Sequence, residues 1–171
     1  MSNQPRRDTN KLRDKLRSWL TEADSVVIAG IGNPIRRDDF IGVEIVRTLR
    51  GRTGPLVNLL ECETAPESFI GQIAKLQPTH VLLIDAGILK QKPGASVLVE
   101  PDQVGSESVV STHALPLQIM CRYLAETTNA TIALLLIQPK DATFGEGLTA
   151  ELLKAKTQLA SLLLRLLPTT Q

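Results

Sequence analysis

The sequence predicts an α/β fold, a three-layer sandwich in which helices cover both faces of a twisted, mostly parallel five-stranded sheet. Two observations predict it. Five apolar, β-branched runs recur along the 171 residues, and segments with helical spacing of apolar residues separate them. Most of these runs are continuously apolar, as strands covered on both faces are. The alternation of strand and helix is typical of a parallel sheet.

The five expected strands span 25–31, 56–62, 80–87, 95–100 and 131–137. The fourth differs from the others in its connection. Only the turn-rich residues 91–94 separate it from the third strand and its tail. A parallel crossover needs a dozen or more residues, so we expect this one strand to run antiparallel.

Four helices are expected between and after the strands, over 39–50, 66–77, 113–126 and 147–167. Pro66 suits a first helical turn and follows Thr64, a candidate N-cap. Leucines from Leu148 to Leu166 recur at helical spacing in the last helix.

Residues 1–24 are expected to form an N-terminal extension, and 25–171 a single α/β domain. We expect the first ten residues to be disordered. A short amphipathic helix is expected over 11–20, with Leu12, Leu16 and Trp19 facing inward.

The overall charge limits the classes of partner. Nineteen basic and eighteen acidic residues leave a net charge of +1, which disfavours nucleic acid and anionic membranes. No apolar run approaches the roughly 18–20 residues of a membrane span, and the polar N-terminus does not read as a secretory signal. Cys62 and Cys121 form no CxxC pair and are expected to be reduced thiols. We therefore expect a cytoplasmic protein, and a monomer.

Ligands of such sheets bind beyond the carboxyl ends of the strands. The first strand leads there into the sequence GIGNPIRRDDFIG, residues 30–42. Gly30 and Gly32 begin like a dinucleotide fingerprint, but two carboxylates at the helix start, Asp38 and Asp39, would repel a pyrophosphate. A nucleotide is therefore disfavoured. The alternative to a functional role is structural, with Asp38 as a cap and Asp39 interacting with the helix dipole.

Two further polar residues lie at the same edge. Asp85 ends the third strand and either caps the next loop or lines a site, because buried acidic residues are rare unless paired. His113 starts a helix and is either a packing residue, a cap or a ligand. Together, Asp39, Asp85 and His113 offer two oxygens and one imidazole nitrogen, a set that suits Ni²⁺ or Zn²⁺ and leaves positions for water or substrate. No GxSxG or HExxH motif is present.

Five blocks of the sequence occur in the order found in one known family. They are GIGNPIRRDDFIG (30–42), TAPE (64–67), LLIDAG (82–87), STHALPL (111–117) and IQP (137–139). Over about residues 25–165 the chain resembles the [NiFe]-hydrogenase maturation endopeptidases. The resemblance implies the same α/β fold. It also implies an aspartyl-type endopeptidase that removes a C-terminal extension from the large-subunit precursor after nickel insertion.

The resemblance also implies the site. Asp39, Asp85 and His113 would contact the metal, and the candidate catalytic carboxylates are Asp39, Asp85 and, in a supporting role, Asp38. The nickel would be carried by the precursor rather than bound permanently, and would mark the precursor as ready for cutting. Arg37 and Phe40 depart from the small residues that members of the family often have. Two alternatives stay open: a hydrolase with its own zinc at these residues, and a non-catalytic chaperone that binds nickel or the precursor.

Overall fold

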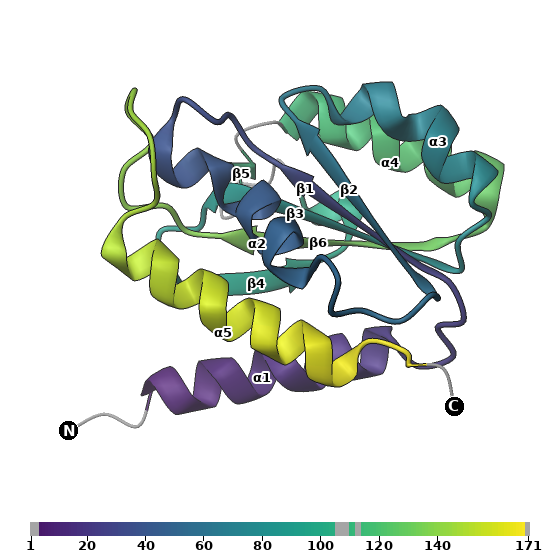
Figure 1. The fold of residues 1–171 in the computed structure, drawn as a ribbon, viewed down its shortest axis with the longest axis horizontal. Helices are drawn as coiled ribbons and strands as arrows, with labels where there is room; N and C mark the ends of the chain where they lie inside the picture. Colours follow the sequence, from purple (N-terminus) through teal and green to yellow (C-terminus); the bar gives the residue numbers. More distant parts are fainter. Residues whose placement is uncertain (1–3, 105–109, 112–113, 170–171) are drawn as a thin grey trace.

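The computed structural model describes the backbone of residues 4–104, 110–111 and 114–169. Its centre is a mixed sheet with the strand order β2-β1-β3-β6-β4 (Figure 1). Four strands are parallel: β1 (Val26–Ile31), β2 (Val57–Glu63), β3 (His80–Ile88) and β6 (Thr131–Ile137). The predicted five-stranded, mostly parallel sheet is confirmed.

The fourth expected strand, β4 (Ser96–Val99), runs antiparallel to β6 at the edge of the sheet, as its short connection predicts. One further strand was not predicted. This is β5 (Val110–Ser111), which pairs antiparallel with the end of β3. Two residues carry no periodicity, so the sequence pattern holds no signal for it.

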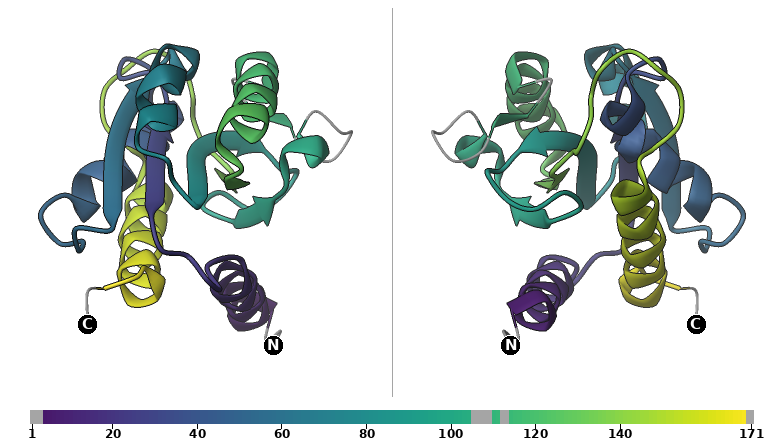
Figure 2. Two further views of the ribbon diagram at one scale, coloured as in Figure 1. Left: turned by 90° about the vertical axis from the view of Figure 1, so that its right-hand side faces the viewer. Right: turned by 90° about the vertical axis from the view of Figure 1, so that its left-hand side faces the viewer.

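Helices cover both faces of the sheet. On one side lie α1 (Gln4–Trp19), α2 (Ile41–Leu49) and α5 (Ala150–Leu166), and on the other lie α3 (Ile70–Lys75) and α4 (Ala114–Thr128) (Figure 2). The short 3₁₀ turns η1 (Arg37–Phe40) and η2 (Pro66–Phe69) lead directly into α2 and α3, and a third, η3 (Pro101–Gln103), follows β4. No helix in the described part of the chain is both long and apolar enough to cross a membrane.

The sheet divides the interior into two apolar cores. In β1, Val26 and Ile28 belong to the core under α1, α2 and α5, while Val27 and Ala29 belong to the core under α3 and α4. Successive side chains of a strand point to opposite faces, so a strand covered twice needs apolar residues at every position. This explains the continuous apolar runs in the sequence.

The helix α1 is longer than the one expected over 11–20. It spans Gln4–Trp19. Pro5 is tolerated because it lies in the first turn, where its missing N–H would have no partner within the helix, and the helix contains no other proline and no glycine. Leu12 and Leu16 are buried in the core that α5 also covers. Trp19 meets the ring of His80 edge to face, with 5.0 Å between centroids. This extension therefore packs on the sheet.

The strand order creates one topological switch point. From β1 the chain passes through α2 to β2 on one side, and from β2 through α3 to β3 on the other side of β1. The connections at the carboxyl ends of β1 and β3 thus diverge, which is where open α/β sheets bind their ligands. Asp39 follows β1, and Asp85 lies near the end of β3.

Candidate active site

The loop after β1 brings Asp39 back against the strand it has just left. Gly32 has φ +145°, and a Cβ built on it would lie 2.0 Å from the carbonyl oxygen of Asp39. Only a glycine fits this approach. The backbone N–H of Asn33 donates to Oδ2 of Asp39 at 2.9 Å, and Asp39 is 4% exposed. Asn33 itself closes a local turn, because its Oδ1 accepts from the N–H of Ile35 at 3.1 Å.

The first turn of α2 lies directly on the sheet. A Cβ on Gly42 would come within 2.1 Å of the carbonyl oxygen of Ile84 and 2.5 Å of that of Ile31. The helix therefore starts in backbone contact with both β1 and β3. This contact places the residues just before α2, including Asp39, at the switch point.

Asp38 is fully buried and fastens a second loop to the start of α2. Its carboxylate accepts hydrogen bonds from the N–H groups of Lys140 and Asp141, both at 2.9 Å, and from the N–H and hydroxyl of Thr149 at 2.7 and 2.9 Å. The reading of Asp38 as a helix cap is wrong, since the N-cap position of η1 is Arg36. Its partners lie more than one hundred residues away in the sequence, which is why local pattern could not find them.

Asp85 is also fully buried, at the other side of the switch point. Its Oδ1 accepts from the N–H of Ala86 at 2.9 Å, and its Oδ2 from the hydroxyl of Ser111 at 2.5 Å. Ser111 lies on β5, opposite Gly87 of β3. The unpredicted strand β5 thus positions a hydroxyl on the candidate carboxylate. Ser111 opens the block STHALPL, in which the residue types indicate His113 as a ligand but give no signal for the serine.

The predicted third ligand, His113, lies outside the described residues. The three-ligand cluster of Asp39, Asp85 and His113 therefore stays a prediction. Among the residues that the structure does describe, no group of three His, Cys, Asp or Glu side chains is arranged to hold a metal ion.

Gln138, at the end of β6, shapes the neighbouring loop. Its Oε1 accepts from the N–H of Leu89 at 2.7 Å and from that of Gln91 at 3.5 Å. These hydrogen bonds hold the chain that follows β3.

The two thiols are not nucleophiles of this site. Cys62 and Cys121 are free and buried in the core under α3 and α4. Burial raises the pKa of each thiol to about 12, so neither is a thiolate near neutral pH.

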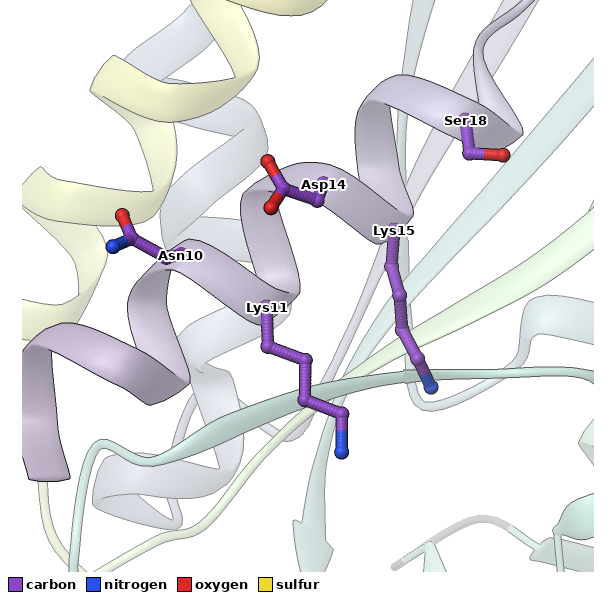
Figure 3. Close-up of a pocket in the computed structure, with 5 residues that line it drawn as sticks. All are labelled: Asn10, Lys11, Asp14, Lys15 and Ser18. Carbon is purple, nitrogen blue, oxygen red and sulfur yellow. The ribbon is translucent and has the colours of Figure 1, made fainter.

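Two hollows in the surface lie away from the carboxylates. One, of about 600 Å³, runs along α1 and is lined by the exposed residues Asn10, Lys11, Asp14, Lys15 and Ser18 (Figure 3). The other, of about 570 Å³, lies between η3, α4 and β6. Neither of these two hollows is lined by Asp38, Asp39 or Asp85.

Fold and site define a class: an α/β protein whose switch point holds buried carboxylates in place of a phosphate-binding loop. The family model for hydrogenase maturation proteases of the HycI type matches residues 43–166. A Methanocaldococcus jannaschii protein assigned as a hydrogenase maturation protease is 33% identical over 141 residues, covering 78% of this chain and 83% of that protein. The Hydrogenase 3 maturation protease of Escherichia coli K12 is 28% identical, covering 66% and 72%.

A solved structure agrees with these sequence relatives. The [NiFe] hydrogenase maturation protease HycI from Thermococcus kodakarensis superposes with a TM-score of 0.82 at 32% identity, covering 89% of this chain and 97% of that one. The chain therefore belongs to the hydrogenase maturation protease family and is a peptidase. The family resemblance read from the sequence is confirmed. The matched residues include Asp85 and begin just after Asp39.

Proposed function

We propose that this peptidase removes a C-terminal extension from the precursor of a [NiFe]-hydrogenase large subunit, after nickel has entered the precursor. The similarity to the Thermococcus kodakarensis protein, whose name specifies [NiFe] hydrogenase, supports the class of substrate. Asp39, Asp85 and His113 approach the nickel, which remains bound to the precursor throughout.

The observation that carries the proposal is the burial of Asp39 at the switch point. Among the described residues its carboxylate accepts one hydrogen bond, from Asn33, and it takes part in none of the described ion pairs. A buried charge is costly unless it is paired. A divalent cation delivered by the substrate offsets that cost, whereas a precursor without nickel leaves it in place. Nickel then acts as a recognition mark.

The chemistry is a hydrolysis. A carboxylate of Asp39 or Asp85 takes a proton from the attacking water, whose oxygen bonds to the carbonyl carbon of the cut peptide bond. The C–N bond breaks, and the proton passes to the leaving amine. Two carboxylate oxygens and the imidazole of His113, two residues after Ser111, suit a Ni²⁺ ion whose other positions the precursor fills.

We place the reaction in the cytoplasm, where buried free thiols such as Cys62 and Cys121 stay reduced. We expect the enzyme to act as a monomer.

The test compares two precursors, nickel-loaded and nickel-free, with wild-type enzyme and with the variants Asp39→Asn, Asp85→Asn and His113→Ala. Asp14→Asn is the control, because Asp14 is an exposed carboxylate on α1. Wild type and the control should cut only the nickel-loaded precursor, and the three variants should cut neither. Equal cutting of both precursors by wild type would exclude the recognition mark. Stoichiometric zinc in the purified enzyme would assign the metal to the enzyme itself.

A further inference from the structure

Two loops at the carboxyl edge are joined into one structure. The N–H of Arg37 donates to the carbonyl of Gly145, and the N–H of Gly145 donates to that of Ile35, each at 3.0 Å. The Nε of Arg36 donates to the carbonyl of Ala142 at 3.1 Å. Together with the hydrogen bonds of Asp38, these contacts hold the loop over 138–149 beside the loop that leads to Asp39.

The joined loops expose two large apolar side chains. Phe144 is 75% exposed and Ile35 is 53% exposed. The guanidinium carbon of Arg36 lies 5.6 Å from the centroid of the Phe144 ring, a cation–π contact. We call Ile35, Arg36 and Phe144 the rim. Its apolar groups are exposed on loops that are already ordered, so little conformational entropy is lost when a partner covers them.

The rim adjoins the candidate active site. Ile35 and Arg36 precede Asp39 by four and three residues in one tightly hydrogen-bonded loop. The substrate of this family is a protein, which is far larger than the loop. Because Ile35 and Arg36 share this loop with Asp39, a precursor segment whose peptide bond reaches Asp39 lies beside the loop that carries the rim.

We propose that the rim is a specificity-determining contact for the hydrogenase precursor, and that Phe144 and Ile35 cover an apolar side chain close to the cut bond. This inference rests on the proposed function. Phenylalanine and arginine are both enriched in protein interfaces relative to the rest of the surface, and here Arg36 and Phe144 contact each other.

The test is steady-state cleavage of nickel-loaded precursor by the double variant Ile35→Ala/Phe144→Ala. The matched control is Tyr123→Ala/Leu153→Ala, since Tyr123 and Leu153 are 50% and 46% exposed on α4 and α5. We expect KM to rise about tenfold in the rim variant with kcat within about twofold of wild type, because the lost contact serves binding. The control should match wild type in both constants.

The variant Phe144→Leu separates contact from folding, because leucine keeps an apolar surface and should recover most of the KM. An unchanged KM in the rim variant, or an equal rise in the control, would overturn the inference. The proposed function fails differently: wild type itself would then leave the hydrogenase precursor uncut.

Discussion

Asp38 and Asp39 are neighbours in the chain but serve different partners. Within the described part of the chain, Asp38 accepts four hydrogen bonds from the loop over 138–149, while Asp39 accepts one from Asn33. Both are buried. Asp38 is thus satisfied within the protein, whereas the buried carboxylate of Asp39 has fewer described partners to offset the cost of its charge.

This difference predicts different effects of the two Asp→Asn substitutions on stability. Asp38→Asn replaces one of the two accepting carboxylate oxygens by an NH₂ group, which cannot accept a hydrogen bond from the N–H donors that face it. We therefore expect the free energy of unfolding to fall by about 1–3 kcal/mol. Asp39→Asn removes a buried charge with one hydrogen bond, and should leave that free energy unchanged or raise it. Urea unfolding of both variants measures this. A loss in Asp39→Asn as large as in Asp38→Asn would contradict the assignment.

Gly32 supports Asp39 through its lack of a side chain. Gly32→Ala places a methyl group 2.0 Å from the carbonyl oxygen of Asp39, at a φ of +145°. We expect it to displace Asp39 and reduce cleavage more than tenfold, in line with the cost of small misplacements in active sites. Gly71→Ala is the control, because nothing lies within 4 Å of its added methyl, and its cleavage rate should equal that of wild type.

The raised pKa of Cys62 and Cys121, about 12 for each, predicts thiols that are inert in the folded enzyme. Iodoacetamide at about pH 8 should leave both unmodified and the activity unchanged. Mass spectrometry counts the modified thiols, and unfolded protein should react at both. Rapid modification with loss of activity would show that a thiol is accessible and needed.

For individual residues, the sequence predicted where the candidate site residues lie but not which groups each of them contacts. Asp39 and Asp85 could be selected because polar residues at the carboxyl ends of strands are few. The role of Asp38 and the contact of Ser111 with Asp85 depend on partners from distant segments. No local pattern encodes such contacts.

Among the elements, strand positions were predictable because coverage on both faces makes each strand apolar throughout. The antiparallel direction of β4 could be predicted from the length of its connection. The length did not predict that β4 pairs with β6. The helix α1 begins seven residues earlier than the expected start at Lys11. Amphipathic spacing marks only the part of a helix that contacts the core.

The contribution of α1 can be measured through Leu16, which is fully buried in the core shared with α5. Leu16→Ala should lower the free energy of unfolding by about 2–5 kcal/mol, since it leaves a cavity. Arg17→Ala, at an exposed neighbouring position, should change it by less than about 0.5 kcal/mol. Equal effects would mean that α1 does not stabilise the domain.

Across the whole molecule, stability should depend on pH through His80, at the opposite end of β3 from Asp85. Burial lowers the pKa of His80, against smaller raising effects of a backbone hydrogen bond at Trp19 and of the charge of Asp24. The unfolded chain then binds this proton more readily than the folded one. Stability from His80 is complete above about pH 6.5 and is lost as the pH falls below it.

Unfolding free energies of wild type and His80→Gln at about pH 7.5 and pH 5.5 test this dependence. Wild type should lose more stability than the variant on going to the lower pH, because the variant has no imidazole to protonate. Equal losses would show that His80 does not contribute.

The central claim is that the edge of the sheet with Asp39 and Asp85 is where a hydrogenase precursor is cut. Intact-mass spectrometry of nickel-loaded precursor, incubated with wild type or with Asp39→Asn/Asp85→Asn, tests it most directly. Wild type should yield a shortened subunit and a released C-terminal peptide, and the double variant should leave the precursor at full mass. A shortened subunit formed at the wild-type rate by the double variant would contradict the account.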